Sequence, residues 1–163
     1  GVVTDSGEVL KEDLFPTKDY PKAEEFVEAL SGKIQNVLKD FENYTFKGIG
    51  VGAPNGNYFS GTIEQAPNLA WEGVVPLVNL FKKYFDVPVI LTNDANAAAI
   101  GEMMFGGAKN MKDFILITLG TGLGSGIVVN GDLVYGHDGF AGEMGHIFVY
   151  PATGRMCGCG RRG

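Results

Sequence analysis

Two residues at the end of a predicted strand have side chains that could do acid–base chemistry. Asn93 and Asp94 follow the apolar segment 87–92 and precede an alanine-rich segment, which predicts a helix ending at Gly106 and Gly107. Asp is a preferred helix N-cap and Asn suits the turn before a helix, so capping explains both residues. The carboxyl end of a strand is also where α/β proteins place ligands, and a carboxylate there could remove a hydroxyl proton as general base. Both interpretations are open at this point.

A glycine-rich loop could bind phosphate. The sequence LGTGLGSG, residues 119–126, follows an apolar predicted strand and has glycines at alternate positions from Gly120 to Gly126. Backbone N–H groups of such a loop can approach an anion, and Thr121 adds a hydroxyl. The loop is neither a Walker loop nor a dinucleotide fingerprint, because no Gly-Lys-Ser/Thr follows and the next predicted element is a strand. A simple glycine-rich β-turn is the alternative.

The two cysteines of the chain belong to a third candidate site. Glu143 and His146 are three residues apart and would share a face of a helical turn, and Cys157 and Cys159 follow in a Cys-Gly-Cys-Gly sequence. A histidine and a Cys-x-Cys pair supply three of the four nitrogen or sulfur ligands that tetrahedral zinc needs, but a fourth is not evident. Two free cysteines are the alternative. A disulfide is disfavoured in a reducing compartment.

The spacing of apolar residues predicts the elements that position these groups. Residues 1–15 predict two strands joined by a tight turn, and residues 48–54 predict a buried strand that runs into a loop. Residues 73–85 have the spacing of a helix. A long amphipathic helix after Pro21 is predicted by apolar residues three or four apart: Phe26, Leu30, Ile34, Val37 and Phe41. Beyond the alanine-rich helix, strand 114–119, the glycine loop, a further strand, an Asn130-Gly131 turn and a last strand are expected.

A short sequence pattern occurs twice in the chain, near the start and near the end of this predicted order of elements. The sequence GIVVNGDLV from Gly126 matches GVVTDSGEV from Gly1 in its β-branched residues, its polar-Gly turn and the acid that follows. The second copy follows a predicted strand and glycine loop, residues 114–125, which the first copy lacks. We therefore expect the first unit to lack one strand and the second to end before its helices. Chance similarity between two hairpins is the alternative.

The composition excludes several classes of protein. The 163 residues are 45% hydrophobic with a net charge of -6, and the pI is about 4.8. This acidic balance argues against a broad basic surface for nucleic acid. No apolar run approaches the roughly 18 residues of a membrane span. No signal-peptide pattern is visible, so we expect a cytoplasmic protein without a membrane partner.

Together these motifs resemble the ROK family of bacterial sugar kinases and repressors, most closely its glucokinases. The segments that carry the resemblance are GAPN, PNLAW, NDANAAAIGE, LGTGLGSGIVVNG with GHDGFAGEMGH, and CGCGRRG. The resemblance implies an α/β fold of the actin-like ATPase (ribonuclease H-like) type, with two related α/β domains that are incomplete here. Residues 1–108 would form most of the N-terminal domain, without its first strand and phosphate loop. Residues 109–163 would start the C-terminal domain, with a phosphate loop and a partial zinc site.

The resemblance also implies an activity, the ATP- and Mg2+-dependent phosphorylation of a hexose, with glucose converted to glucose 6-phosphate. Asp94 matches the catalytic base. The residues that match sugar-binding positions are Asn93, Asp94, Glu143 and His146, together with Asn68 in PNLAW. The residues that match the loop for the phosphates of ATP are Gly120, Thr121, Gly122 and Gly124.

A structural Zn2+ is implied as well, with His146, Cys157 and Cys159 matching three of the family's ligands and the fourth cysteine expected directly after Gly163. Family members form homodimers or homotetramers, so either state is expected. Because two nucleotide-binding segments of the family are not among these residues, the 163 residues alone are predicted to be inactive. A sugar-sensing ROK repressor, whose DNA-binding segment would lie outside these residues, is the alternative function.

Overall fold

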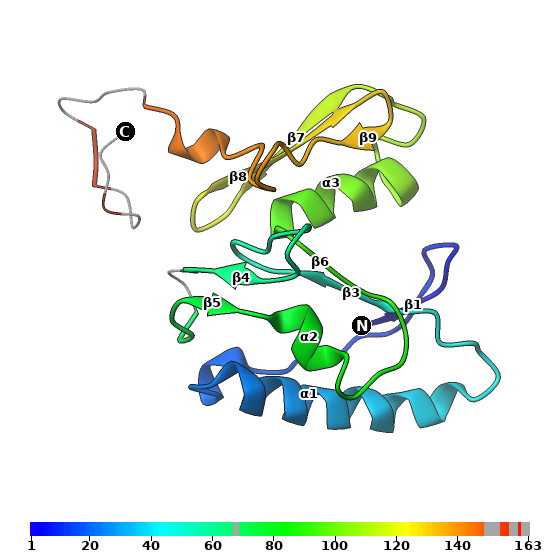
Figure 1. Ribbon diagram of the computed structural model, residues 1–163. Helices are drawn as coiled ribbons and strands as arrows, with labels where there is room; N and C mark the ends of the chain where they lie inside the picture. The colour runs from blue at the N-terminus through cyan, green and yellow to red at the C-terminus, as the bar shows by residue number, and fades with distance from the viewer. Residues whose placement is uncertain (67–68, 149–153, 157–159, 161–163) are drawn as a thin grey trace.

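The computed structural model describes residues 1–66, 69–148, 154–156 and 160, and shows short strands layered with helices (Figure 1). Helix α1 forms one outer layer, small sheets lie above it, and α3 separates these sheets from the hairpin strands of the second half of the chain. The strands are β1 (Val2–Val3), β2 (Val9–Lys11), β3 (Ile49–Gly52), β4 (Ile63–Glu64), β5 (Val74–Val75), β6 (Val89–Thr92), β7 (Phe114–Leu119), β8 (Leu123–Val129) and β9 (Asp132–Leu133). The α-helices are α1 (Ala23–Leu38), α2 (Leu77–Phe81) and α3 (Asp94–Phe105), and the 3-10 turns are η1 (Thr17–Asp19), η2 (Lys39–Phe41) and η3 (Met144–His146). No helix among these described residues is both long and apolar enough to cross a lipid bilayer.

Parallel pairing of β3 with β6 sets the edge at which the candidate base lies. Their register runs from Ile49 opposite Val89 to Gly52 opposite Thr92, so both strands end at the same edge. The N–H of Ala53 then donates to the carbonyl of Thr92 at 3.0 Å, which extends the pairing by one residue. The other described sheets are antiparallel: β1 with β2, β4 with β5, and β7–β8–β9.

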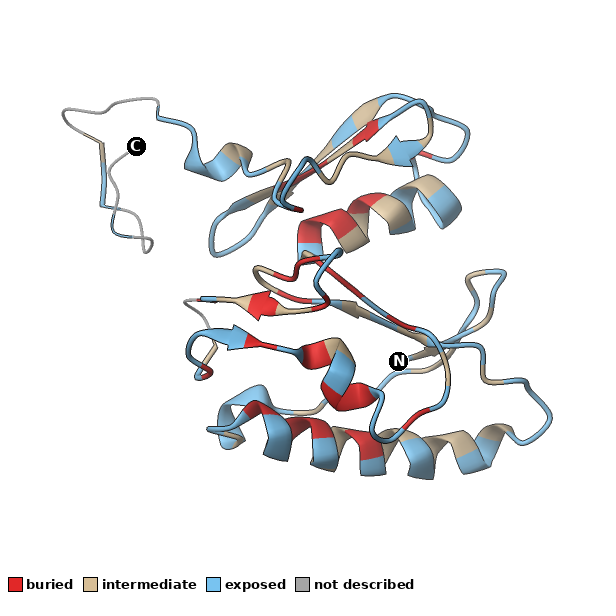
Figure 2. Ribbon diagram, viewed as in Figure 1, coloured by how far each residue is buried: buried red, intermediate tan, exposed pale blue. Residues whose placement is uncertain are grey.

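The main core lies between α1, α2 and β6 (Figure 2). Val27 of α1 and Leu91 of β6 are almost completely buried. Trp71 packs against Phe26 with ring centroids 5.0 Å apart, and its indole N–H donates to the carbonyl of Tyr20 at 3.1 Å. This core explains the apolar spacing of the first helix, which ends at Leu38 and continues as the 3-10 turn η2.

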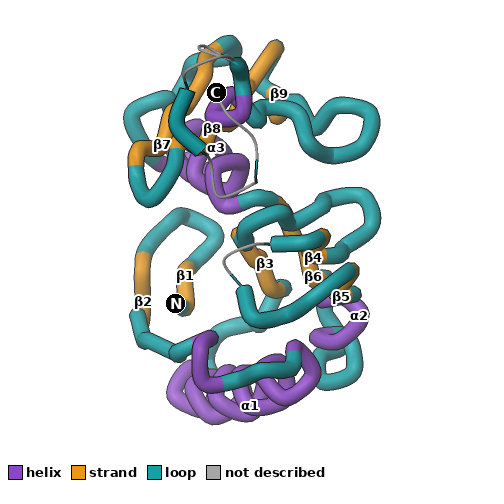
Figure 3. Tube along the Cα trace, turned by 90° about the vertical axis from the view of Figure 1, so that its left-hand side faces the viewer, coloured by secondary structure: helices purple, strands orange, loops and turns teal. Residues whose placement is uncertain are grey.

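Small residues allow α3 to lie directly against β8 (Figure 3). A Cβ on Gly126 would lie 2.6 Å from the Cβ of Ala99, which is fully buried. A Cβ on Gly124 would lie 3.0 Å from that of Ala95. Because both distances are shorter than ordinary contacts between carbon atoms, these two glycines are required for the helix to approach the strand.

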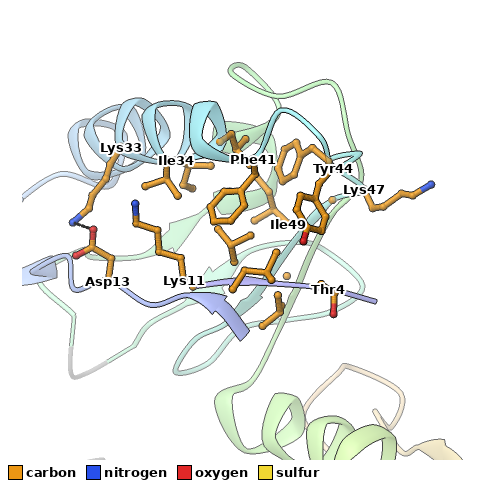
Figure 4. A pocket seen from close by; sticks show the side chains of 18 of the residues that line it. Thr4, Lys11, Asp13, Lys33, Ile34, Phe41, Tyr44, Lys47 and Ile49 are labelled. Carbon is orange, nitrogen blue, oxygen red and sulfur yellow. Dashed lines mark ion pairs between the residues drawn. The ribbon is translucent and has the colours of Figure 1, made fainter. Parts of the chain in front are cut away.

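A groove of about 770 Å³ separates the β1–β2 hairpin from β3. Gly1–Thr4 line one side and Ile49 and Gly50 of β3 line the other, while Ile34 and Leu38 of α1 lie at its base. Figure 4 shows Ile34, Phe41 and Ile49 around this groove, with the Lys33–Asp13 ion pair (3.0 Å) at one end. The described residues form no strand pairing between β1 and β3.

The prediction of a helix over residues 73–85 was wrong for more than half of that segment. Val74–Val75 form β5, which pairs with β4, and the N–H of Gln65 donates to the carbonyl of Gly73 at 2.9 Å. Pro76 then stands before α2, which covers only Leu77–Phe81. A backbone that pairs in a strand cannot form helical hydrogen bonds, so the helix begins after Pro76. The two-residue strand β4 was not predicted.

Candidate functional site

Asn93 and Asp94 lie where β6 ends and α3 begins, as the sequence predicted. Asn93 is the N-cap, and its Oδ1 accepts a hydrogen bond from the N–H of Ala95 at 2.8 Å. Asp94 is the first helical residue, and its Oδ1 accepts from the same N–H at 2.9 Å. Helix capping therefore describes part of what both side chains do. It uses one oxygen of each side chain.

The other polar atoms of these two residues remain available to a ligand. Asn93 Nδ2 and Asp94 Oδ2 have no hydrogen-bond partner among the described residues, and the side chain of Asp94 is exposed. The pair thus presents a donor and an acceptor side by side at the common edge of β3 and β6. This arrangement suits the recognition of a hydroxyl group and the removal of its proton.

The glycine loop forms a tight hairpin turn between β7 and β8. The N–H of Gly120 donates to the carbonyl of Gly122 at 3.0 Å, so the β-turn interpretation describes its local structure. A Cβ on Gly120 or Gly122 would meet nothing within 4 Å, which leaves their backbone open to an approaching group. Gly124 differs, because packing against Ala95 and Thr118 accounts for its lack of a side chain. That packing places the start of β8 beside the first turn of α3, next to Asp94.

Glu143 and His146 meet on a short 3-10 turn. The Oε2 atom of Glu143 lies 3.6 Å from Nε2 of His146, with 43% and 50% of the two side chains exposed. The sequence prediction that the two share a face is confirmed, with η3 in place of an α-helical turn. Both side chains can therefore reach a bound molecule.

Ser125 of β8 forms hydrogen bonds with the turn that bears Glu143. This residue was not predicted from the sequence. Its buried hydroxyl donates to the carbonyl of Gly142, and the N–H of Met144 donates to the same hydroxyl at 3.4 Å. Gly142 has φ +90°, and a Cβ there would lie 2.7 Å from the carbonyl oxygen of Ser125. The only sequence signal was a second hydroxyl residue, after Thr121, within a glycine-rich segment. The strand that follows the candidate phosphate loop thus also holds the turn that bears Glu143.

Three predicted site residues, Asn68, Cys157 and Cys159, lie outside the described residues. Within the described part of the chain, no group of three or more His, Cys, Asp or Glu side chains could hold a metal ion. The predicted zinc ligands are therefore represented by His146 alone.

Comparison with known proteins places the chain in a family. A sequence model of the ROK family matches residues 1–163. The chain is 40% identical to a glucokinase of Streptomyces coelicolor, over 100% of this chain and 50% of that protein. It is also 36% identical to the xylose repressor of Caldicellulosiruptor bescii, over 96% of this chain and 40% of the repressor.

The structure is similar to that of a ROK family glucokinase from Streptomyces griseus in complex with glucose and AMPPNP. The TM-score is 0.83 at 38% identity, covering 100% of this chain and 50% of that one. The chain thus spans about half the length of the glucokinases it matches. The match extends over every described element and confirms the fold class that the motifs implied. The chain belongs to the ROK family and has the actin-like ATPase type of α/β fold.

Proposed function

We propose that this chain carries part of the active site of an ATP-dependent hexose kinase that phosphorylates glucose at its 6-hydroxyl. The observation that carries the proposal is the position of Asn93 Nδ2 and Asp94 Oδ2 at a strand end beside the glycine hairpin, where neither atom has a hydrogen-bond partner among the described residues. The similarity to glucokinases of known sequence and structure supports the same reading. We assign residues 1–108 to one α/β domain and residues 109–163 to the start of a second.

In this reaction Asp94 accepts the proton of the sugar hydroxyl as that oxygen attacks the γ-phosphate. The Oδ1 atom stays on the N–H of Ala95, which fixes the carboxylate while Oδ2 faces the substrate. Asn93 donates to a neighbouring sugar hydroxyl through Nδ2. Glu143 and His146 bind further hydroxyls from the second domain, so the sugar lies between the two domains. Asn68 is proposed to line the same pocket.

The glycine hairpin is proposed to hold the phosphates of ATP. The open backbone of Gly120 and Gly122 can donate to phosphate oxygens, and Thr121 adds a hydroxyl beside them. Mg2+ supplies charge neutralisation on the transferring phosphates when it is bound. Positioning and electrostatic stabilisation then provide most of the catalysis.

A structural Zn2+ is proposed to fix the ring of His146. The donor set of His146, Cys157 and Cys159 suits zinc, because imidazole nitrogen and thiolate sulfur are its preferred ligands. Zinc held by these residues would fix the tautomer and orientation of the His146 ring, whose Nε2 lies 3.6 Å from Oε2 of Glu143. We further propose a cytoplasmic homodimer or homotetramer, and that these 163 residues by themselves do not turn over substrate.

The second candidate is a sugar-sensing repressor, which the similarity to xylose repressors favours. Such a protein would use Asn93, Glu143 and His146 to bind sugar without phosphoryl transfer. The net charge of -6 over the 163 residues does not favour binding to DNA, so the kinase remains the preferred function.

Sugar-dependent ADP release by the gene product that contains these residues tests the proposal. Glucose, N-acetylmannosamine and fructose are compared, with Asp94→Asn as the test variant and Asp86→Asn, at an exposed position, as its matched control. Asparagine keeps an oxygen for the N–H of Ala95 but cannot accept a proton, so kcat should fall by about 10²- to 10⁴-fold. Unchanged turnover in Asp94→Asn would contradict the role of the base. Sugar binding without ADP release would favour the repressor.

A further inference from the structure

Two loops from different parts of the chain meet beside the candidate sugar site. The first comprises residues 57–60, between β3 and β4, and the second comprises residues 135–139, after β9. The side-chain amide of Asn57 donates from Nδ2 to the carbonyl of Asp138 at 2.8 Å. Gly139 has φ +86°, and a Cβ there would lie 2.9 Å from Asn57 Oδ1, so only glycine allows this approach. We call this contact the loop bridge.

Asn57 is well suited to hold both loops at once. It is 6% exposed, and its Oδ1 accepts from the N–H groups of Phe59 at 2.9 Å and Ser60 at 3.2 Å. These two bonds shape its own loop. The hydrogen bond from Nδ2 to the carbonyl of Asp138 joins this loop to residues 135–139. The Asn57 side chain therefore fixes both loops.

Aromatic rings form the second part of the loop bridge. The rings of Tyr58 and Tyr135 are stacked, with centroids 4.2 Å apart and an angle of 15°. Phe59 packs against the same Tyr135 ring at 5.8 Å and 63°. Tyr58 and Phe59 remain 41% and 61% exposed, so these rings connect two loops at the surface and do not belong to the main core.

The loop bridge lies between the two halves of the candidate sugar site. Gly56, which directly precedes Asn57, lies against the end of β6, because a Cβ there would lie 2.5 Å from the carbonyl oxygen of Thr92. Thr92 is the last residue of β6 and directly precedes Asn93 and Asp94. At the other end, residues 135–139 lead within four residues to Glu143. The bridge therefore spans from the strand end that bears the base to the turn that binds the sugar from the second domain.

We propose that Asn57 and Tyr135 are positioning residues, which set the spacing between Asp94 and Glu143 by joining the two loops of the bridge. The inference rests on the proposed function, because that spacing matters only if one sugar contacts both residues. A sugar held from two sides is sensitive to small displacements, since an error of about 1 Å in the reacting geometry can reduce the rate by 10²-fold. Neither residue needs to contact the substrate for this role.

Three variants separate the bridge from local folding. Asn57→Asp keeps the oxygen that accepts from Phe59 and Ser60 but removes the donor to Asp138. Tyr135→Ala removes the stacked ring, whereas Tyr135→Phe keeps the ring and loses only the hydroxyl. Tyr44→Ala is the matched control, because the Tyr44 ring packs on Phe41 within the first domain, with centroids 6.0 Å apart.

For each variant of the full gene product we would measure kcat, the KM for sugar and the melting temperature. Amide hydrogen exchange would be measured in both loops of the bridge. Asn57→Asp and Tyr135→Ala should raise KM and lower kcat, each by about tenfold, as expected when the two sides of a site lose their spacing. Exchange at residues 135–141 should accelerate in Asn57→Asp, although the substitution is in the other loop. Tyr135→Phe and Tyr44→Ala should stay within about threefold of the unsubstituted protein.

A lower melting temperature with unchanged KM in both bridge variants would overturn this inference and leave Asn57 and Tyr135 a purely structural role. In that case the unsubstituted protein still turns over sugar, and the proposed function stands. Absence of turnover in the unsubstituted protein would instead overturn the proposed function, and this inference with it.

Discussion

The hydroxyl of Ser125 donates a hydrogen bond to the carbonyl of Gly142, and so joins β8 to the turn that bears Glu143. Ser125 is 4% exposed, so water does not replace this bond when it is lost. The contact connects the strand after the candidate phosphate loop with a residue of the candidate sugar site. A change at Ser125 should therefore alter both stability and sugar binding.

We expect Ser125→Ala to lower the free energy of unfolding by about 1 kcal/mol, because the carbonyl of Gly142 still accepts from the N–H of Met144. Chemical denaturation measures the loss. Ser6→Ala, which removes an exposed hydroxyl in the β1–β2 turn, is the control and should change stability by less than about 0.5 kcal/mol. Equal effects of the two substitutions would show that the Ser125 contact does not stabilise the turn.

Gly126→Ala should force α3 away from β8. The added Cβ would lie 2.6 Å from that of Ala99, and overpacking of this kind costs about 1–3 kcal/mol. Gly32→Ala in α1 is a matched control, because a Cβ there meets nothing within 4 Å. It should raise stability by about 0.5–1 kcal/mol through a better helix propensity. Thermal denaturation should thus show opposite signs, and a tolerated alanine at position 126 would contradict the close packing.

The pH dependence of stability should report the burial of Tyr135. Its pKa is raised in the folded state, so the folded protein keeps the hydroxyl proton when the unfolded chain begins to lose it. Tyr135 therefore contributes stability that is fully present below about pH 10, the usual tyrosine value, and is lost as pH rises further. The difference in stability between the unsubstituted protein and Tyr135→Phe, measured in urea from pH 8 to 11, should be constant and then decrease. An increase above pH 10 would contradict this sign.

A strand added ahead of Gly1 should enter the groove between β1 and β3. A second copy of residues 112–125 placed there would reproduce the order of β7, glycine loop and β8 in the first unit. We expect a higher melting temperature and slower amide exchange in β3, because backbone groups at the groove gain partners. A control addition with proline in place of the copied Leu116 should give a smaller effect, since proline interrupts strand pairing. Identical stability with and without the addition would contradict the pairing of the added strand at this groove.

Much of the local structure could be predicted from sequence because it follows from local patterns. The bounds of β7 agree with the apolar run 114–119, and α3 begins and ends where Asn93 and Gly106 predict. The segment 73–85 was misread because its helical spacing competed with pairing to β4, a strand of only two residues. Such pairing depends on a partner strand outside the segment, here Ile63 opposite Val75, so periodicity within the segment does not reveal it.

In the candidate site, too, local features could be predicted and contacts between separate segments could not. The placement of Asn93 and Asp94 between a strand and a helix, and of Glu143 beside His146, could be predicted from residue type and spacing. Ser125 and the loop bridge could not, because their partners lie far along the chain: Asn57 and Asp138 are 81 residues apart in sequence. The glycine spacing predicts that Gly124 belongs to a phosphate loop, yet its packing against Ala95 is enough to require glycine.

The groove between β1 and β3 also has a consequence for how copies of this chain behave together. One edge of β1 and one edge of β3 have no paired strand among the described residues, and apolar side chains lie between them. Exposed strand edges of this kind are templates for strand addition from another molecule. The open edges of β1 and β3 can therefore accept an extended segment through main-chain hydrogen bonds.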